Sequence, residues 1–485
     1  MKTIYKLLVV GASWTCLLLL IIHALEGNDF PISMVVFPLV YSTFATGLFM
    51  FRDISKSKYR ITLYVVISIQ WMRCVFLPVF GVFSGKYSSL FNSQYFNDTW
   101  LLMFIEEIAV WCVCFYFAFK NRTAEQKNEL NKRCVFAGTP VMYVLFAIFA
   151  FVLYFVFARD EQLFSFIILD VGEDGRVSDE SGNSLLTIIT TIVTTAITFI
   201  ALTLIYKFYR LYEKTESKRW IYLSMLVAGL MLCIIIGEQR NRQLFILFAY
   251  VIVLVSLFPQ KKKSIALTLG IVAGAVLVFM SIYKFFNAFL YDSYFDAIQN
   301  AEMSFDEAVG MVDSYFYGFS VVNKNLGFVE NTNISTFQIF SDLFRNTFGV
   351  HYVFRGHLSI TEIYNLYLYS GEQSAGHLFS AIAYGYMTLG WLAPIMTVLN
   401  LAVAAFLESK IGKVSSIEWK YVLSTIYMRF AFSCFSCFAP LLNVASRTVI
   451  INAVVIVASG LLMKKHSKVK VQILGPKPLK SSKGL

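Results

Sequence analysis

The chain has 485 residues, of which 58% are hydrophobic, 17% are aromatic and only 15% are charged. A soluble core cannot bury that share of apolar surface, so the composition excludes a soluble globular protein and is typical of a polytopic membrane protein. The 41 Lys and Arg outnumber the 30 Asp and Glu. They cluster in short segments between apolar runs, which indicates membrane topology and argues against a nucleic-acid-binding surface.

Apolar runs long enough to cross about 30 Å of hydrocarbon predict an all-α polytopic integral membrane protein with about twelve transmembrane helices. The first run follows two lysines, but the residues after it form a poor signal-peptide cleavage site, so we expect a retained helix. In chain order the runs begin near Tyr5, Ser33, Ile61, Trp100, Val141, Leu185, Ile221, Leu244, Ile265, Leu378, Trp419 and Thr448.

Two polar insertions divide these runs and set the predicted domain organisation. Residues 1–290 hold the first nine spans, with an outer loop at 159–183, and residues 291–375 form a large extracytoplasmic segment. Residues 376–463 hold the last three spans, and residues 464–485 are a basic cytoplasmic tail. The large segment mixes polar and aromatic residues, unlike a linker, so we expect it to fold.

Basic residues predict the orientation, because Lys and Arg are in excess in cytoplasmic loops. With both termini inside, the cytoplasmic segments contain 29 of the 41 Lys and Arg. Counting the spans from a cytoplasmic N-terminus places residues 237–242, with the sequence GEQRNR, on the outer side. Arg240 and Arg242 therefore contradict the charge bias. They are either an unusual solvated turn or a pair of guanidiniums that binds a diphosphate.

Charged residues also occur inside two predicted spans. Arg73 lies in IQWMRCVFLPVFG, and Glu106 and Glu107 lie in LLMFIEEIAVWC. An ionisable group inside a span is costly and is by default a functional candidate. The alternative is an internal Arg–Glu ion pair that fixes helix packing.

The large outer segment brings basic residues and histidines together in one stretch, DLFRNTFGVHYVFRGHLSITEIYN. Residues 291–375 contain only three basic residues against ten acidic ones, and Arg345 and Arg355 both fall in this stretch. His351 lies between them, and Glu372 and His377 follow before the next span. Histidine suits base catalysis near neutral pH, although a single histidine is more often structural.

Motifs for nucleotides and metals are missing from the sequence. No Walker loop, Rossmann glycine pattern, HExxH or GxSxG motif occurs. The acidic stretch from Asp170 to Glu180 has Ser181 where a calcium loop requires a bidentate carboxylate, so we interpret it as a solvated loop. We therefore expect no cofactor and no metal.

Local patterns along nearly the whole chain resemble the bacterial O-antigen and capsular polysaccharide repeat-unit polymerases. Arg345, ten further residues and Gly356 are similar to an outer-loop pattern of some members, whereas Ser380 stands where similar proteins tend to have proline. The matching stretches are MRCVFLPVFGVFSG with Arg73 and Pro78, FIEE, GEQRNR, DSYFYGFSVVN from Asp313, and YNLYLYSGEQSAGHLFSAIAYGYMTLGWLAP with Asn365, Gly371, Gly390 and Pro394.

The resemblance implies a glycosyltransferase of the bacterial cytoplasmic membrane that joins undecaprenyl-diphosphate-linked oligosaccharide repeat units at the outer face. It also allows an arrangement like that of the GT-C membrane glycosyltransferases. A flippase and a chain-length regulator are further partners that it implies, and nucleic acid is not among them.

A sugar on a lipid diphosphate is already activated, so the reaction requires cations for the departing diphosphate and a base for the attacking hydroxyl. We expect Arg240 and Arg242, helped by Arg345 or Arg355, to bind the diphosphate, with Arg73 as a further substrate-binding candidate. The candidate bases are His351, Glu372 and His377.

Two other functions fit parts of the pattern. A ligase that moves a finished glycan onto an acceptor needs the same donor chemistry. A transporter or flippase of lipid-linked sugars would explain the charges inside the spans. However, the sequence has no repeated half and no pair of broken helices at matching positions, which transporters often have.

Overall fold

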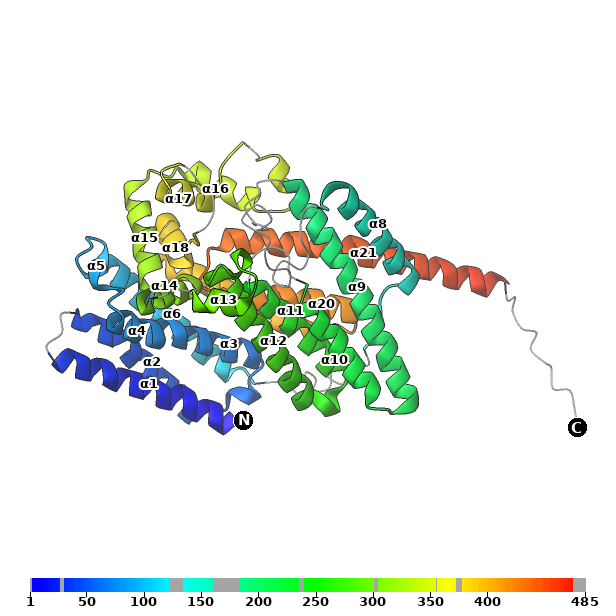
Figure 1. The fold of residues 1–485 in the computed structure, drawn as a ribbon, viewed down its shortest axis with the longest axis horizontal. Helices are drawn as coiled ribbons and strands as arrows, with labels where there is room; N and C mark the ends of the chain where they lie inside the picture. The colour runs from blue at the N-terminus through cyan, green and yellow to red at the C-terminus, as the bar shows by residue number, and fades with distance from the viewer. Residues whose placement is uncertain are drawn as a thin grey trace, which may run out of the picture.

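A computed structural model describes residues 2–26, 30–121, 134–159, 184–234, 240–300, 304–354, 356–371 and 377–473. Within these ranges the chain forms helices and no strand beyond isolated bridges. Nine of the described helices are long and apolar enough to cross a membrane. The chain is thus an all-α protein with the helices of a multi-pass membrane protein, as the sequence predicts (Figure 1).

The first layer of helices comes from the N-terminal part of the chain. Its buried side chains form one apolar cluster, which also takes in residues from the outer segment and from the C-terminal helices. The elements are α1 (Lys2–Leu25), η1 (Ile32–Val35), α2 (Val36–Phe51), η2 (Ile54–Lys56), α3 (Arg60–Trp71), a π-helix η3 (Met72–Phe76), α4 (Leu77–Phe83), α5 (Ser88–Phe91) and α6 (Phe96–Phe119).

A second group of helices packs around a separate apolar cluster. Helix α20 (Ile417–Phe432) joins the two groups, because it packs against α3 on one side and α11 on the other. The other members are α8 (Pro140–Phe157), α9 (Ser184–Thr215), α10 (Arg219–Leu232), α11 (Arg240–Leu257), η4 (Pro259–Lys261) and α12 (Lys262–Phe285).

The described part of the predicted outer segment folds mostly into short helices joined by turns. Three of them begin with a capping box, in which a serine side chain and a Glu or Gln three residues later satisfy each other's backbone N–H groups. These helices are α14 (Phe305–Phe316), α16 (Thr336–Arg345) and α17 (Ile360–Leu368). The remaining elements of the segment are α13 (Tyr294–Gln299), α15 (Phe319–Asn331) and η6 (Val350–Tyr352), and η5 (Ala288–Leu290) directly precedes it.

The span expected to begin near Leu378 is not one continuous helix. Helix α18 (Ala381–Leu389) ends at Gly390, which has a φ of +59°, and η7 (Gly390–Leu392) leads into α19 (Pro394–Ile411). A Cβ on Gly385 would lie 2.3 Å from the carbonyl oxygen of Ala393. Only glycine permits that approach, so α18 and α19 form a tight helical hairpin.

The C-terminal helix and the shorter helices leave the predicted number of about twelve spans open. Helix α21 (Phe438–Ile473) contains the last of the nine candidates, 438–461. The apolar helices Arg219–Leu232 and Gln243–Leu257 are shorter than the other candidates, and α20 has 16 residues. The number of spans and the side of each terminus therefore stay predictions.

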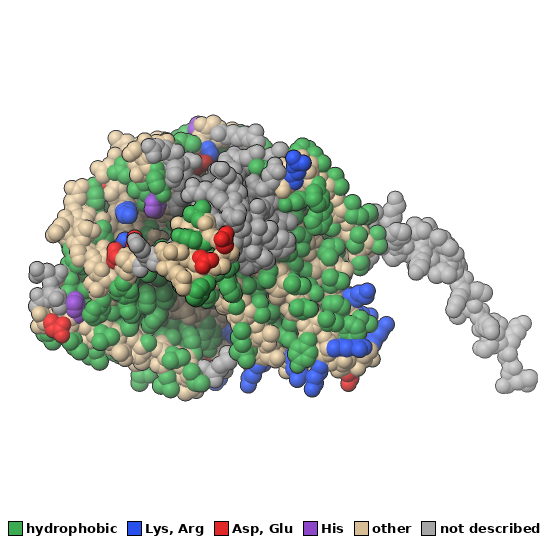
Figure 2. Space-filling model, viewed as in Figure 1, with side chains coloured by type: hydrophobic (Ala, Val, Ile, Leu, Met, Phe, Trp, Pro, Cys, Tyr) green, Lys and Arg blue, Asp and Glu red, His purple; other side chains and the backbone are tan. Residues whose placement is uncertain are grey.

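Basic side chains gather along the lower right edge of the molecule in Figure 2, where α9 ends and α10 and α12 begin (Figure 1). The outer-segment helices α15, α16 and α17 lie toward the opposite, upper left side (Figure 1). The orientation inferred from the charge bias expects this separation, and which side is cytoplasmic stays a prediction.

The orientation leads to a direct test with single added cysteines. Asn333, which is exposed between α15 and α16, should react as Asn333→Cys with a membrane-impermeant maleimide in intact cells. Ser217→Cys, between α9 and α10, should react only after the cells are opened. The wild-type chain with its own cysteines gives the background, and labelling of Ser217→Cys in intact cells would overturn the topology.

Candidate functional site

Arg73 lies on the π-helix between α3 and α4. This helix form is rare overall, but where it occurs it is often at a functional site. Nη1 of Arg73 donates to Oε2 of Glu106 on α6, and Thr397 of α19 donates to the other carboxylate oxygen. Arg73 is 3% exposed and Glu106 is 0% exposed. The Arg–Glu ion pair that the sequence offered as one alternative therefore forms, and it is buried.

The rest of the Arg73 guanidinium binds the outer segment and the C-terminal part of the chain. Its Nε donates to the backbone carbonyl of Tyr317 at 2.8 Å, and its Cζ lies 4.1 Å from the ring centroid of Phe435. Arg73 thus connects four separate parts of the chain. Nη2 of Arg73 is buried and has no hydrogen-bond partner among the described residues. Because Nη1, Nε and the face of the guanidinium are all occupied by the protein, Arg73 in this state acts as a positioning residue.

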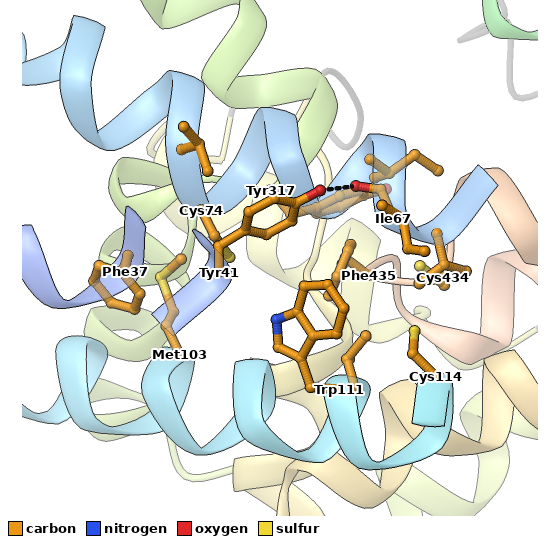
Figure 3. Packing of buried hydrophobic residues seen from close by; sticks show 14 of the residues in the cluster. Phe37, Tyr41, Ile67, Cys74, Met103, Trp111, Cys114, Tyr317, Cys434 and Phe435 are labelled. Atoms are coloured by element: carbon orange, nitrogen blue, oxygen red, sulfur yellow. Dashed lines mark hydrogen bonds between the residues drawn. The ribbon is translucent and has the colours of Figure 1, made fainter. Parts of the chain in front are cut away.

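The segment between α20 and α21, which contains Phe435, is irregular, and its residues 434–437 are buried. Asn400 on α19 donates through Nδ2 to the carbonyls of Cys434 and Ser436 at 2.8 and 2.9 Å. The segment also pairs with the start of α18, where Ala381 N–H donates to Phe435 O at 2.7 Å. Figure 3 shows Cys434 and Phe435 among the side chains of Trp111 and Cys114 from α6.

A second arginine, Arg429 on α20, lies near the beginning of α11. Its Cζ is 5.2 Å from the ring centroid of Phe245, a residue of the second turn of α11. Burial raises the pKa of the Tyr317 hydroxyl, and the charge of Arg429 acts in the opposite direction. Arg429 is not among the candidates expected from the sequence, although its position in the apolar run STIYMRFAFSCF was an available signal.

Arg345 and His377 are held in place by their neighbours. Nη2 of Arg345 donates to Oε1 of Glu362 at 2.7 Å, and the same glutamate caps the first turn of α17. Asn365 is 0% exposed; its Oδ1 accepts the His377 N–H at 2.6 Å and its Nδ2 donates to the His377 carbonyl at 3.1 Å. This clamp fixes the backbone of His377 just before α18.

The His377 imidazole is half-buried and stacks on Tyr369, with ring centroids 5.3 Å apart. Burial lowers its pKa below 6.5, and the positive charge of Lys324 lowers it further. At neutral pH the ring is therefore uncharged and able to accept a proton, which is what a general base requires.

The side chains of five predicted site residues lie outside the part of the chain that the structure describes. Arg355 and Glu372 lie outside the described residues altogether. The backbone of His351 is in η6, and Arg240 and Arg242 stand in the first turn of α11. Whether the arginine pair or the three candidate bases come together therefore lies outside the described side chains. Within the described ranges, no cluster of His, Cys, Asp or Glu is arranged to hold a metal ion.

Comparison with known proteins identifies no relative. No protein-family model, curated protein or solved structure matches this chain.

Asp342 connects α16 to α17 in the outer segment. Its Oδ1 accepts from the Ile360 N–H and from Nδ2 of Asn346, both at 3.0 Å. Burial raises the pKa of this carboxyl from 3.8 to about 6, although the Ile360 N–H favours the charged form. The ionised carboxylate therefore carries a desolvation cost in the folded segment.

The Arg73–Glu106 pair predicts an asymmetry between two substitutions. Arg73→Ala leaves a buried carboxylate without its partner, which typically costs about 3–5 kcal/mol. Glu107→Gln, at the residue next to Glu106 on α6, removes no ion pair that the structure describes. Thermal unfolding of the purified protein should show a much lower Tm for Arg73→Ala than for Glu107→Gln. An unchanged Tm with lost activity would instead assign Arg73 to substrate.

Asp342 predicts that the outer segment becomes less stable between about pH 4 and pH 6. The folded pKa lies above the unfolded one, so the folded state binds more protons in this window and stability falls as pH rises. Hydrogen exchange of α16 and α17, corrected for intrinsic rates, should show this loss. Asp342→Asn should abolish it, whereas Asp306→Asn, at an exposed carboxyl whose pKa is lowered, should not. A loss that persists in Asp342→Asn would contradict the assignment.

Proposed function

We propose that the chain is a glycosyltransferase of the bacterial cytoplasmic membrane that polymerises undecaprenyl-diphosphate-linked oligosaccharide repeat units into an O-antigen or capsule. The observation that carries the proposal is the clamped, uncharged His377. Asn365 holds it at the point where the folded outer segment meets the hairpin α18–α19. A base fixed where an outer segment joins membrane helices suits a substrate whose lipid stays in the bilayer.

The start of α11 supplies the second element of the proposal. The N-terminus of a helix favours anions through its unpaired N–H groups and its dipole. Arg240 and Arg242 occupy that first turn, and Arg429 of α20 lies beside the following turn through Phe245. Several cations near one helix N-terminus fit a diphosphate, which carries more than one negative charge.

The reaction then balances without a cofactor. The acceptor hydroxyl oxygen of the incoming repeat unit attacks the anomeric carbon of the growing chain. The bond from that carbon to the diphosphate oxygen breaks, the arginines stabilise the departing lipid diphosphate, and His377 accepts the hydroxyl proton. Direct displacement inverts the anomeric centre. His351 and Glu372 are the alternative bases in the same scheme.

Surface polysaccharide of a deletion strain distinguishes this function from the two alternatives. Loss of the polymerase should leave glycans of a single repeat unit attached to the cell surface. Loss of a ligase should abolish attachment, and loss of a flippase should cause lipid-linked units to accumulate inside.

The arginine pair gives the sharpest test of the chemistry. Lys is a poor substitute at a bidentate phosphate site, and losing a preorganised contact to developing charge costs about 3 kcal/mol, on the order of a hundredfold in rate. At least one of Arg240→Lys and Arg242→Lys should sharply reduce polymer made from purified lipid-linked units.

Arg219→Lys, at the first residue of α10 on the predicted cytoplasmic side, is the matched control and should retain the wild-type rate. Wild-type rates for both Arg240→Lys and Arg242→Lys would show that the pair is only an unusual turn. The cations would then be sought at Arg345, Arg355 and Arg429.

A further inference from the structure

One face of helix α15 carries four residues at helical spacing, Lys324, Gly327, Glu330 and Asn331. Residues three and four positions apart lie on the same side of a helix. The side chains of Lys324, Glu330 and Asn331 are exposed, whereas Gly327 is buried. Gly327 lets the ring of Tyr95 pack closely against the helix, because a Cβ there would lie 3.1 Å from that ring. The face therefore presents an amide, a carboxylate and an ammonium group around a buried glycine that Tyr95 contacts.

Aromatic side chains border this face on one side. Asn331 Nδ2 donates to the Tyr95 hydroxyl at 2.9 Å, just before α6 begins. The Tyr386 hydroxyl of α18 interacts with the Glu330 carboxylate. Tyr386 also makes an edge contact with Trp391, with ring centroids 5.7 Å apart, and Trp391 is 45% exposed.

A second aromatic border comes from α17 and the residues after it. The Tyr367 hydroxyl lies 3.5 Å from Asn331 Nδ2, and Tyr367 is 47% exposed. Tyr369 stacks on His377, and Lys324 is close enough for its charge to lower the pKa of His377. Figure 2 shows a basic and a histidine side chain on the surface near α15, among tan atoms of the backbone and of other side chains.

We propose that this α15 face, with its aromatic borders, binds the oligosaccharide of the incoming repeat unit. A sugar has apolar C–H faces that pack on aromatic rings, and hydroxyls that exchange hydrogen bonds with amide, carboxylate and ammonium groups. The α15 face offers both kinds of group on one exposed surface. The proposal rests on the proposed function and adds to it the surface that selects the acceptor.

The composition of the face decides between a glycan and a lipid or protein partner. Helix α16 also exposes an aromatic row, Phe337, Phe340 and Phe344, but phenylalanine rings have no hydrogen-bonding groups. That row suits an apolar partner. The α15 face instead pairs each aromatic border with a polar side chain of the helix. Because the border includes His377, a glycan bound here lies beside the candidate base.

A binding experiment on the full-length protein in lipid nanodiscs tests the proposal. The probe is the water-soluble oligosaccharide released by mild acid from lipid-linked repeat units of the strain that carries this chain. Binding is measured by saturation-transfer NMR, in which sugar protons near aromatic rings are enhanced. Tyr367→Ala and Trp391→Ala should each raise Kd about tenfold, the equivalent of about 1.4 kcal/mol.

Two further variants separate recognition from misfolding. Tyr367→Phe keeps the ring and removes only the hydroxyl, so it should weaken binding less than Tyr367→Ala. Phe337→Ala, an equally exposed aromatic on α16, should bind as the wild type does. Equal binding by wild type, Tyr367→Ala and Trp391→Ala would overturn the proposal, and so would a wild-type protein that does not bind the oligosaccharide.

The polymerase function and the glycan face can fail separately. If the wild type binds the oligosaccharide and the face variants do not, the face stands even when purified lipid-linked units yield no polymer. If polymer forms with an unchanged KM for the acceptor in both alanine variants, the face is wrong and the polymerase function stands.

Discussion

The buried pairing of Arg73 with Glu106 is the constraint on which the arrangement of the chain depends. A charge inside a membrane protein is costly unless an opposite charge and hydrogen bonds compensate it. Arg73 meets this requirement by binding α6, the backbone of the outer segment and the ring of Phe435 at once. The same contacts fix the outer segment and the link between α20 and α21 relative to the first helices.

Irregular backbone within a helix bundle has a similar requirement. Backbone N–H and C=O groups that no helix pairs are tolerated at membrane depth where surrounding protein groups form hydrogen bonds with them. Asn400 pairs the carbonyls of Cys434 and Ser436, and Asn325 of α15 accepts the N–H of Ser380 at 2.9 Å. Two buried asparagines therefore permit the breaks before α18 and α21. Phe435 in the second break lies against Arg73 and accepts the N–H of Ala381 at the first.

The sequence predicts the parts of the fold that depend on local chemistry. Apolar runs gave most of the helices, and capping serines such as Ser359 sit where the outer helices begin. The α18–α19 hairpin was not predictable, because the close contact of Gly385 with Ala393 is tertiary. The same holds for the site. Arg73 and His377 were identified from their types and settings, whereas the α15 face needs residues from four elements that are distant in sequence.

Helix α15 has two faces with opposite tasks, and this links the fold to the proposed chemistry. On its buried side Asn323 donates to Thr99 of α6 at 3.2 Å, and Asn325 holds Ser380. On its exposed side Asn331 and Lys324 point toward the aromatic borders and His377. A rigidly anchored helix positions its exposed groups more accurately than a loop does. The same helix holds the start of α18 and borders His377. The proposed glycan face and the candidate base therefore share one support, and in the proposed function this shared support couples acceptor recognition to proton transfer.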